Sequence, residues 1–201
     1  GEPSFQIYGE HIGPTMAASE VFLETAVDAG QALVVGANTM VGRTEREVTR
    51  RAVKLAGESG IPILMDPNHR PTRWDDEATA VDFGLELARR ATVVKCNRQE
   101  ATLLTGEESA LEAARELAGL GPRLIVVTDR EKEIVTAGEA EVRWTPRPVD
   151  VVSPLGAGDA FMGSLAAGLA GLGWDLSRVA EVLPLATADA TACCLHWGAR
   201  P

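Results

Sequence analysis

Short hydrophobic runs alternate along the chain with longer segments whose hydrophobic positions recur at helical spacing. Runs of this length and β-branched content predict strands, and the longer segments predict amphipathic helices. Strands are predicted at Leu33–Val35, Ile61–Met65, Thr92–Val94 and Leu124–Val127, with a hairpin joining Ile134–Thr136 to Glu141–Trp144. Helices are predicted from Thr44 to a stop at Gly60, at Asp75–Arg90, Arg98–Thr105 and Ser109–Gly119, in a long segment after Gly158, and at Ser177–Leu195.

This alternation predicts an α/β fold with a mostly parallel sheet between helices, a three-layer αβα arrangement. No internal repeat or linker is visible, so residues 1–201 are interpreted as one core. Ligands bind such sheets beyond the carboxyl ends of the strands. Small, polar and charged residues follow the predicted strands at this edge, among them Asn38, Asp66, Asn68, Asn97 and Asp129.

Three predicted helices open with a polar residue followed three positions later by glutamate, the spacing of a capping box. The pairs are Thr44 with Glu47, Asn97 with Glu100, and Ser109 with Glu112. The second pair also allows a functional interpretation, because hard cations prefer carboxylate oxygens and Glu100 could hold magnesium through water. The residues alone leave both interpretations open.

The segment Leu155–Phe161 joins a predicted valine-rich strand at Val149, Val151 and Val152 to the long helix. Free backbone N–H groups in the first turn of a helix form an anion site, and glycines let the anion approach closely. Asp159 stands in this turn, and a carboxylate beside an anion site is what a general base for phosphoryl transfer requires. The alternative is that Asp159 only caps the helix.

Composition removes several classes of function. The formal net charge is −10 and the pI is about 4.8, which argues against binding nucleic acid or an anionic membrane surface. No signal peptide is visible, and no uncharged run is long enough to predict a membrane span. Cys96, Cys193 and Cys194 have neither zinc spacing nor the number for a disulfide framework, so we expect buried thiols in a reducing cytoplasm.

Three motifs together carry a family resemblance. Asp66-Pro67-Asn68-x-Arg70, Asn97-x-x-Glu100 and Gly156-Ala157-Gly158-Asp159 follow one another in the order and separation found in ribokinase-like, pfkB-type carbohydrate kinases. The first motif most resembles the fructokinase and 2-keto-3-deoxygluconate kinase branch. The resemblance implies a ribokinase-like fold and transfer of phosphate from ATP, with Mg²⁺, to a hydroxyl of a sugar or sugar acid.

The resemblance also implies roles for single residues. Asp159 would take the proton from the sugar hydroxyl, and the backbone N–H groups of Gly156, Ala157 and Gly158 would hold the transferred γ-phosphoryl group. Asn97 and Glu100 would organise magnesium and its waters.

The resemblance implies further roles near the acceptor sugar and near the adenine of ATP. Asn68 and Arg70 would lie near phosphate or an acidic sugar. The adenine would rest between the loop at Thr128 and the last helix, near Ala188 and Thr191.

The chain departs from the family pattern in two loops. Ser153-Pro154 stands where the family usually has Asp-Thr, a region that shapes a monovalent-cation site in many members, so potassium dependence stays open. Arg130 and Glu133 stand where the family has glycines near the nucleotide. Arg130 could pair with a phosphate or obstruct the loop.

The resemblance starts near Phe5–Tyr8 and breaks off near Trp197–Ala199, so we expect the sugar-reading lid portion and a final element to be largely absent. In this family the lid usually mediates pairing, which leaves a homodimer open. Two alternatives to a sugar kinase also stay open: a nucleotide-binding or regulatory protein without catalysis, and a nucleoside kinase of the same fold.

Overall fold

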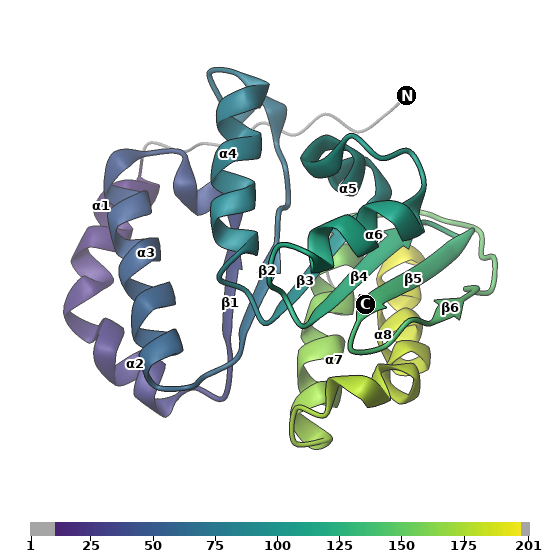
Figure 1. The fold of residues 1–201 in the computed structure, drawn as a ribbon. Helices are drawn as coiled ribbons and strands as arrows, with labels where there is room; N and C mark the ends of the chain where they lie inside the picture. Colours follow the sequence, from purple (N-terminus) through teal and green to yellow (C-terminus); the bar gives the residue numbers. More distant parts are fainter. Residues whose placement is uncertain (1–10, 198–201) are drawn as a thin grey trace.

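One six-stranded sheet organises the computed structural model, which describes residues 11–197 (Figure 1). The first four strands are mutually parallel, and the last two are antiparallel to their neighbours, so the predicted mostly parallel α/β fold is confirmed. Spatial order follows chain order: β1 (Leu33–Gly36), β2 (Ile63–Asp66), β3 (Val93–Asn97), β4 (Leu124–Asp129), β5 (Glu133–Gly138) and β6 (Arg143–Trp144).

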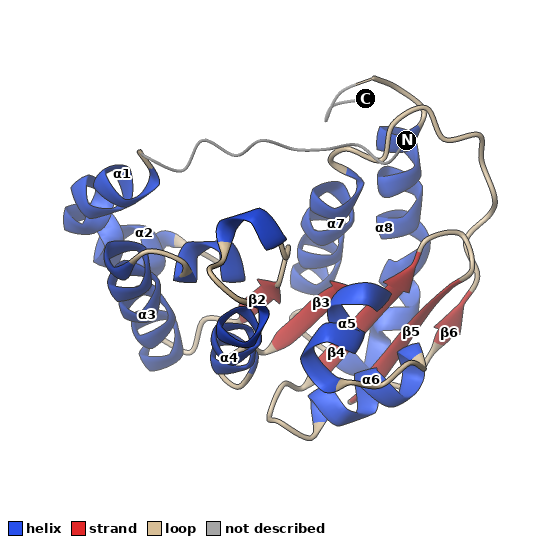
Figure 2. Cartoon of the chain, turned by 90° about the horizontal axis from the view of Figure 1, so that it is seen from above, coloured by secondary structure: helices blue, strands red, loops and turns tan. Residues whose placement is uncertain are grey.

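Helices cover both faces of the sheet, and Figure 2 shows α7 and α8 on the side opposite α4, α5 and α6. On the α4–α6 side lie α3 (Arg43–Glu58), α4 (Glu77–Ala88), α5 (Arg98–Thr105) and α6 (Ala110–Ala118), and α1 (Ile12–Ser19) and α2 (Leu23–Ala29) pack against α3. On the opposite side lie α7 (Ala157–Gly171) and α8 (Val179–Cys194). Short 3₁₀ turns span Glu20–Phe22, Ala37–Met40, Pro71–Arg73 and Leu176–Arg178.

Successive strand residues point to opposite faces and therefore feed two separate cores. Val94 and Cys96 belong to the core shared with α3 to α6, whereas Val93 and Val126 belong to the core shared with α7 and α8. The second core ends before β1, where Val34 is 53% exposed. The α7–α8 side of β1 is therefore open to solvent, and this opening leads into the site described below.

Two of the three predicted helix caps are present in the structure. The side chains of Ser109 and Asn97 each accept a hydrogen bond from the glutamate N–H three residues later, as predicted. The prediction for Thr44 is wrong: α3 already begins at Arg43, and Gly42 precedes it without a side-chain cap. Glu47 pairs instead with the guanidinium of Arg43 at 3.0 Å.

The predicted hairpin is confirmed, since Ile134 of β5 lies opposite Trp144 of β6. The predicted valine-rich strand is wrong, because residues 149–152 form no strand and Val151 is 57% exposed. The N–H groups of Val152 and Ser153 donate to the Cys194 carbonyl at the end of α8, so they join no ladder. Pro148 and Pro154, which flank this segment, have no backbone N–H and cannot donate a hydrogen bond to a neighbouring strand.

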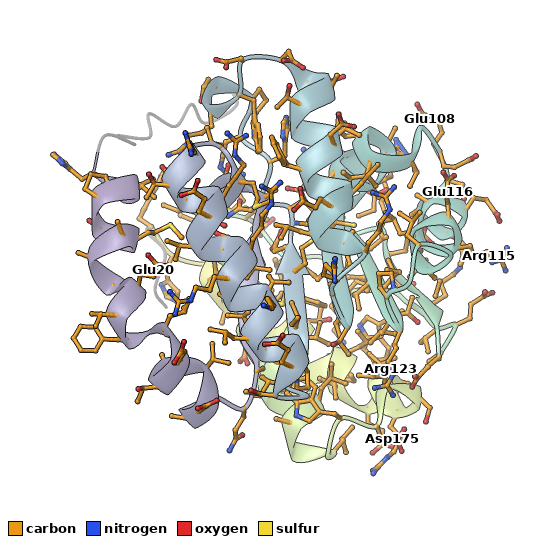
Figure 3. The ribbon with its side chains drawn as sticks, turned by 60° about the vertical axis from the view of Figure 1, so that its left-hand side comes forward. Glu20, Glu108, Arg115, Glu116, Arg123 and Asp175 are labelled. Atoms are coloured by element: carbon orange, nitrogen blue, oxygen red, sulfur yellow. The ribbon has the colours of Figure 1, made fainter. Side chains whose placement is uncertain are left out.

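Charged side chains lie at the periphery, as Figure 3 shows for Arg115, Glu116 and Arg123. Arg115 binds Glu141 through two nitrogens, which joins α6 to the segment before β6. No helix among residues 11–197 has the length and hydropathy to cross a bilayer. Within those residues no disulfide joins the cysteines; Cys96 and Cys193 are buried, as expected, whereas Cys194 is half-buried.

The residues on which the expected start and end of the resemblance depend lie mostly outside the described range. This holds for Phe5–Tyr8 and for residues 198–201. The interpretation of residues 1–201 as one core stays a prediction.

Candidate active site

A hollow of about 310 Å³ opens beyond the carboxyl ends of β1 and β2, beside the start of α7. Its polar lining comes from Asp66, Asn68 and Asp159. The apolar lining comes from Val34, Val35 and Met162, with the glycines Gly36 and Gly163. The predicted edge of the sheet therefore does bring together residues that lie far apart in the sequence.

Asp159 lies in the first turn of α7 and its side chain is exposed. The residue at the N-cap is Gly156, and α7 has no side-chain cap, so the interpretation of Asp159 as a capping residue is wrong. Within residues 11–197 no hydrogen bond or ion pair engages the Asp159 carboxylate. It is a free carboxylate at the wall of the hollow, where a hydroxyl could reach it.

The start of α7 has the geometry of an anion site. Gly156 has φ +84°, the left-handed region that glycine adopts without steric cost, and its turn leads directly into the helix. Among the described residues the N–H groups of Gly156 and Gly158 have no acceptor, whereas Ala157 donates to the Pro154 carbonyl at 3.3 Å. Unpaired N–H groups and the positive end of the helix dipole favour an anion here.

Glu100 is buried at the start of α5, with 6% of its surface exposed. Its two oxygens accept hydrogen bonds from the N–H groups of Asn97 and His69, each at 2.9 Å. Burial raises the pKa of Glu100, the nearby Asp66 carboxylate raises it further, and the two hydrogen bonds work in the opposite direction. The capping box is real, and the same carboxylate also ties α5 to the loop after β2.

A buried ion pair that the sequence did not predict lies beneath the hollow. The Lys95 ammonium of β3 donates to the Asp66 carboxylate of β2 at 2.8 Å, and both side chains are largely buried. Burial is the largest single effect and disfavours the charged Lys95, but the charge and hydrogen bond of Asp66, together with the nearby Glu100, outweigh it, so the pKa of Lys95 is raised. The available signal was a lysine inside a strand whose other interior residues, Val94 and Cys96 among them, are apolar.

The loop after β2 is held in a defined shape. Asn68 has φ +43°, its N–H donates to the Asp66 carboxylate at 3.0 Å, and its carbonyl accepts from the Asn38 amide at 2.6 Å. Arg70 is half-buried, and its guanidinium donates to the His69 carbonyl at 3.1 Å. Of the two residues predicted here, Asn68 lines the hollow and Arg70 does not.

The predicted nucleotide residues are not gathered at the hollow. The Thr128 hydroxyl donates to the Cys96 carbonyl, the Thr191 hydroxyl donates to the Thr187 carbonyl, and Ala188 is exposed on α8. Asn97 uses its side chain for the cap of α5. The nucleotide roles of these residues stay predictions.

The two unusual loops have distinct structures. Arg130 lies in the turn from β4 to β5 with φ +50°, the region that favours glycine, and Glu133 begins β5 as an ion-pair partner of Arg143. Ser153 is buried, and its hydroxyl accepts the Leu155 N–H at 3.3 Å, which orders the approach to α7.

The carboxylates at this edge suit magnesium bound through water rather than by a closed protein cage. Asp66 lines the hollow and Glu100 is buried behind it. Both oxygens of each carboxylate already accept a hydrogen bond, so neither is free to form a closed cage. No group of three or more His, Cys, Asp or Glu side chains among residues 11–197 could hold a metal on its own. Magnesium typically keeps several waters and takes one or two carboxylates plus substrate phosphate, which this arrangement permits.

The sequence matches a family and curated proteins. The family described as "pfkB family carbohydrate kinase" matches residues 1–200. A fructokinase from Klebsiella pneumoniae is 32% identical over 162 residues, which are 79% of this chain and 53% of that protein. A cytidine kinase from Thermococcus kodakarensis is 35% identical over 113 residues, 54% of this chain and 40% of that protein.

The fold matches solved structures. Aminoimidazole riboside kinase from Salmonella enterica, complexed with aminoimidazole riboside and an ATP analogue, superposes with a TM-score of 0.75 at 26% identity. The match covers 83% of this chain and 57% of that one. This chain thus spans about half the length of the proteins it matches.

Proposed function

This chain belongs to the pfkB family of carbohydrate kinases, whose pattern spans residues 1–200, and on that premise we propose that the protein transfers the γ-phosphoryl group of ATP to a hydroxyl of a ketose or sugar acid. The proposed acceptor is fructose or a 2-keto-3-deoxygluconate-type acid.

One observation carries this proposal. The exposed carboxylate of Asp159 lines the hollow. The N–H groups of Gly156 and Gly158, which have no acceptor among the described residues, lie in the same turn at the start of α7. A base for the acceptor hydroxyl and a site for the transferred anion are thereby adjacent. In phosphoryl transfer, positioning and charge neutralisation supply most of the rate.

Each of these groups has a separate role in the transfer. Asp159 accepts the proton of the acceptor hydroxyl as its oxygen bonds to the γ-phosphorus, and the bond from that phosphorus to the ADP oxygen breaks. The N–H groups at the start of α7 bind the equatorial oxygens of the transferred group, where charge is spread in the transition state. Ala157 takes part if its N–H, donated at 3.3 Å to Pro154, turns toward the phosphoryl group.

Asp66 and Glu100 are the residues that would hold magnesium through water, with Asn97 beside them. Bound there, magnesium would supply neutralisation of the phosphate charge. Thr128, Ala188 and Thr191 are proposed to border the adenine, with Arg70 and Asn68 on the side of the acceptor. The use of ATP, and cysteines that form no disulfide among the described residues, both favour the cytoplasm. Pairing into a homodimer stays a prediction.

The match to a cytidine kinase favours a second candidate, a nucleoside kinase that uses the same base and the same anion site. The two differ only in the acceptor. The hollow does not separate them, because its polar lining beyond Asp159 consists of Asp66 and Asn68, which could bind hydroxyl groups of either acceptor.

The test is sugar-dependent ADP release by the 201-residue chain, and by the longer protein where its coding frame extends further. The acceptors are fructose, 2-keto-3-deoxygluconate, cytidine and adenosine, each with Mg²⁺-ATP. The proposal expects the highest turnover with one of the first two. Faster turnover with a nucleoside would establish the second candidate, and nucleotide binding without ADP release from any acceptor would identify a non-catalytic protein.

A further inference from the structure

Lys95 lies at a position from which its charge can act on the transferred group. We propose that the Lys95 ammonium binds the γ-phosphoryl group at the start of α7 and stabilises the charge on it during transfer. This assignment deepens the proposed function and rests on it.

The first argument is proximity. A Cβ atom placed on Gly158 would lie 3.2 Å from the Lys95 nitrogen, so the ammonium sits directly against the first turn of α7. Gly158 belongs to the turn whose N–H groups form the anion site. The missing side chain at Gly158 therefore leaves the lysine and the helix start facing one another without an intervening group.

The second argument is electrostatic. The start of a helix carries partial positive charge, so a cation placed there is repelled unless an anion beside both offsets the repulsion. Asp66 holds Lys95 from the other side at 2.8 Å, which keeps the ammonium in place while no phosphate is bound. A phosphoryl group at α7 would be attracted by the ammonium and by the helix start together.

The third argument concerns the donors. An ammonium carries three N–H donors, and Asp66 is the acceptor that the described residues provide to Lys95. Packing alone does not require a charge here, since replacing a buried ion pair with apolar residues of similar volume is often neutral or stabilising. The remaining donors, the buried charge and the adjacent anion site together point to a ligand oxygen.

The chemistry balances without any further reactant. The acceptor oxygen forms a bond to the γ-phosphorus, its proton passes to Asp159, and the electron pair of the breaking bond leaves on the ADP oxygen. Lys95 keeps its proton throughout and contributes charge and hydrogen bonds. It is not the base, because an ammonium has no lone pair.

The experiment compares wild type with Lys95→Met and Lys95→Gln. Met removes the charge, and Gln removes the charge but retains a donor for Asp66. Lys54→Met, at an exposed lysine of α3, is the control. Calorimetry measures the Kd of Mg²⁺-ADP and of a Mg²⁺-bound, non-hydrolysable ATP analogue, ADP release measures turnover, and thermal unfolding reports folding.

The proposal expects both Lys95 variants to weaken the ATP analogue about tenfold or more while the Kd of ADP changes less than about threefold. It expects turnover to fall about 10²-fold or more, the range for removing one preorganised donor of a charge-stabilising site. Lys54→Met should match wild type in all measurements.

Equal losses for both nucleotides, unchanged binding of the analogue, or unfolding of both Lys95 variants would overturn the proposal and assign Lys95 to structure. If wild type releases no ADP with any acceptor, the proposed function fails while the two Kd values still decide the role of Lys95. If wild type binds neither nucleotide, both fail.

Discussion

The backbone N–H of His69 donates a hydrogen bond to the carboxylate of Glu100 at 2.9 Å, across 31 residues of sequence. The other Glu100 oxygen accepts the N–H of Asn97, also at 2.9 Å. A single buried carboxylate therefore fixes the loop after β2 against the first turn of α5. From the sequence, this residue could be a helix cap or a magnesium ligand; in the structure it caps α5 and also joins the loops that follow β2 and β3.

Glu100→Ala should lower the free energy of unfolding by about 1–3 kcal/mol, because it leaves two backbone N–H groups without their acceptor near the core. Urea unfolding at neutral pH measures the difference. The control is Glu116→Ala, on the exposed side of α6 (Figure 3), which should change stability by no more than about 0.5 kcal/mol. Equal losses in the two variants would show that the Glu100 contacts contribute nothing specific.

Gly158→Ala should separate stability from ligand binding. Alanine is the better helix former by about 1 kcal/mol, so the melting temperature should stay the same or rise. The added Cβ would lie 3.2 Å from the Lys95 nitrogen and crowd the anion site, so the affinity for an ATP analogue should fall roughly tenfold, about 1.4 kcal/mol.

Gly171→Ala, near the other end of α7, is the matched control, because no atom lies within 4 Å of its added Cβ. It should bind the analogue as wild type does. Wild-type affinity in Gly158→Ala would contradict the placement of the phosphoryl group at this turn.

Gly156→Ala should destabilise the protein by about 1–2 kcal/mol, because a residue with a Cβ is strained at φ +84°. Thermal and urea unfolding both measure this loss. Gly57→Ala within α3, where the added Cβ meets no atom within 4 Å, should instead leave stability unchanged or raise it. A stable Gly156→Ala variant would mean that the turn before α7 adopts another backbone conformation.

Local pattern was sufficient for much of the fold. The strands at Leu64, Val93 and Val126 are fully buried apolar runs, and the starts of α5 and α6 follow from Asn97 and Ser109 with a glutamate three residues on. These features depend on neighbours in sequence, so the sequence predicts them.

Two features that the sequence did not predict depend on residues distant in the chain. The segment around Val151 is rich in valine, as strands are. Its N–H groups donate to the end of α8, and the flanking prolines cannot donate, so it pairs with no strand. The pairing of Lys95 with Asp66 spans 29 residues, and its approach to Gly158 depends on how α7 packs on the sheet. The sequence shows a lysine within an apolar strand, but sequence spacing reveals neither its pairing with Asp66 nor its approach to Gly158.

The most direct test of the central claim is sugar-dependent ADP release by Asp159→Asn beside wild type, in protein shown by calorimetry to bind Mg²⁺-ATP. Asparagine keeps the size of the side chain and cannot accept the hydroxyl proton. The account predicts that turnover falls about 10²-fold or more while the Kd of the nucleotide stays within about threefold of wild type. Near-normal turnover in Asp159→Asn would contradict it.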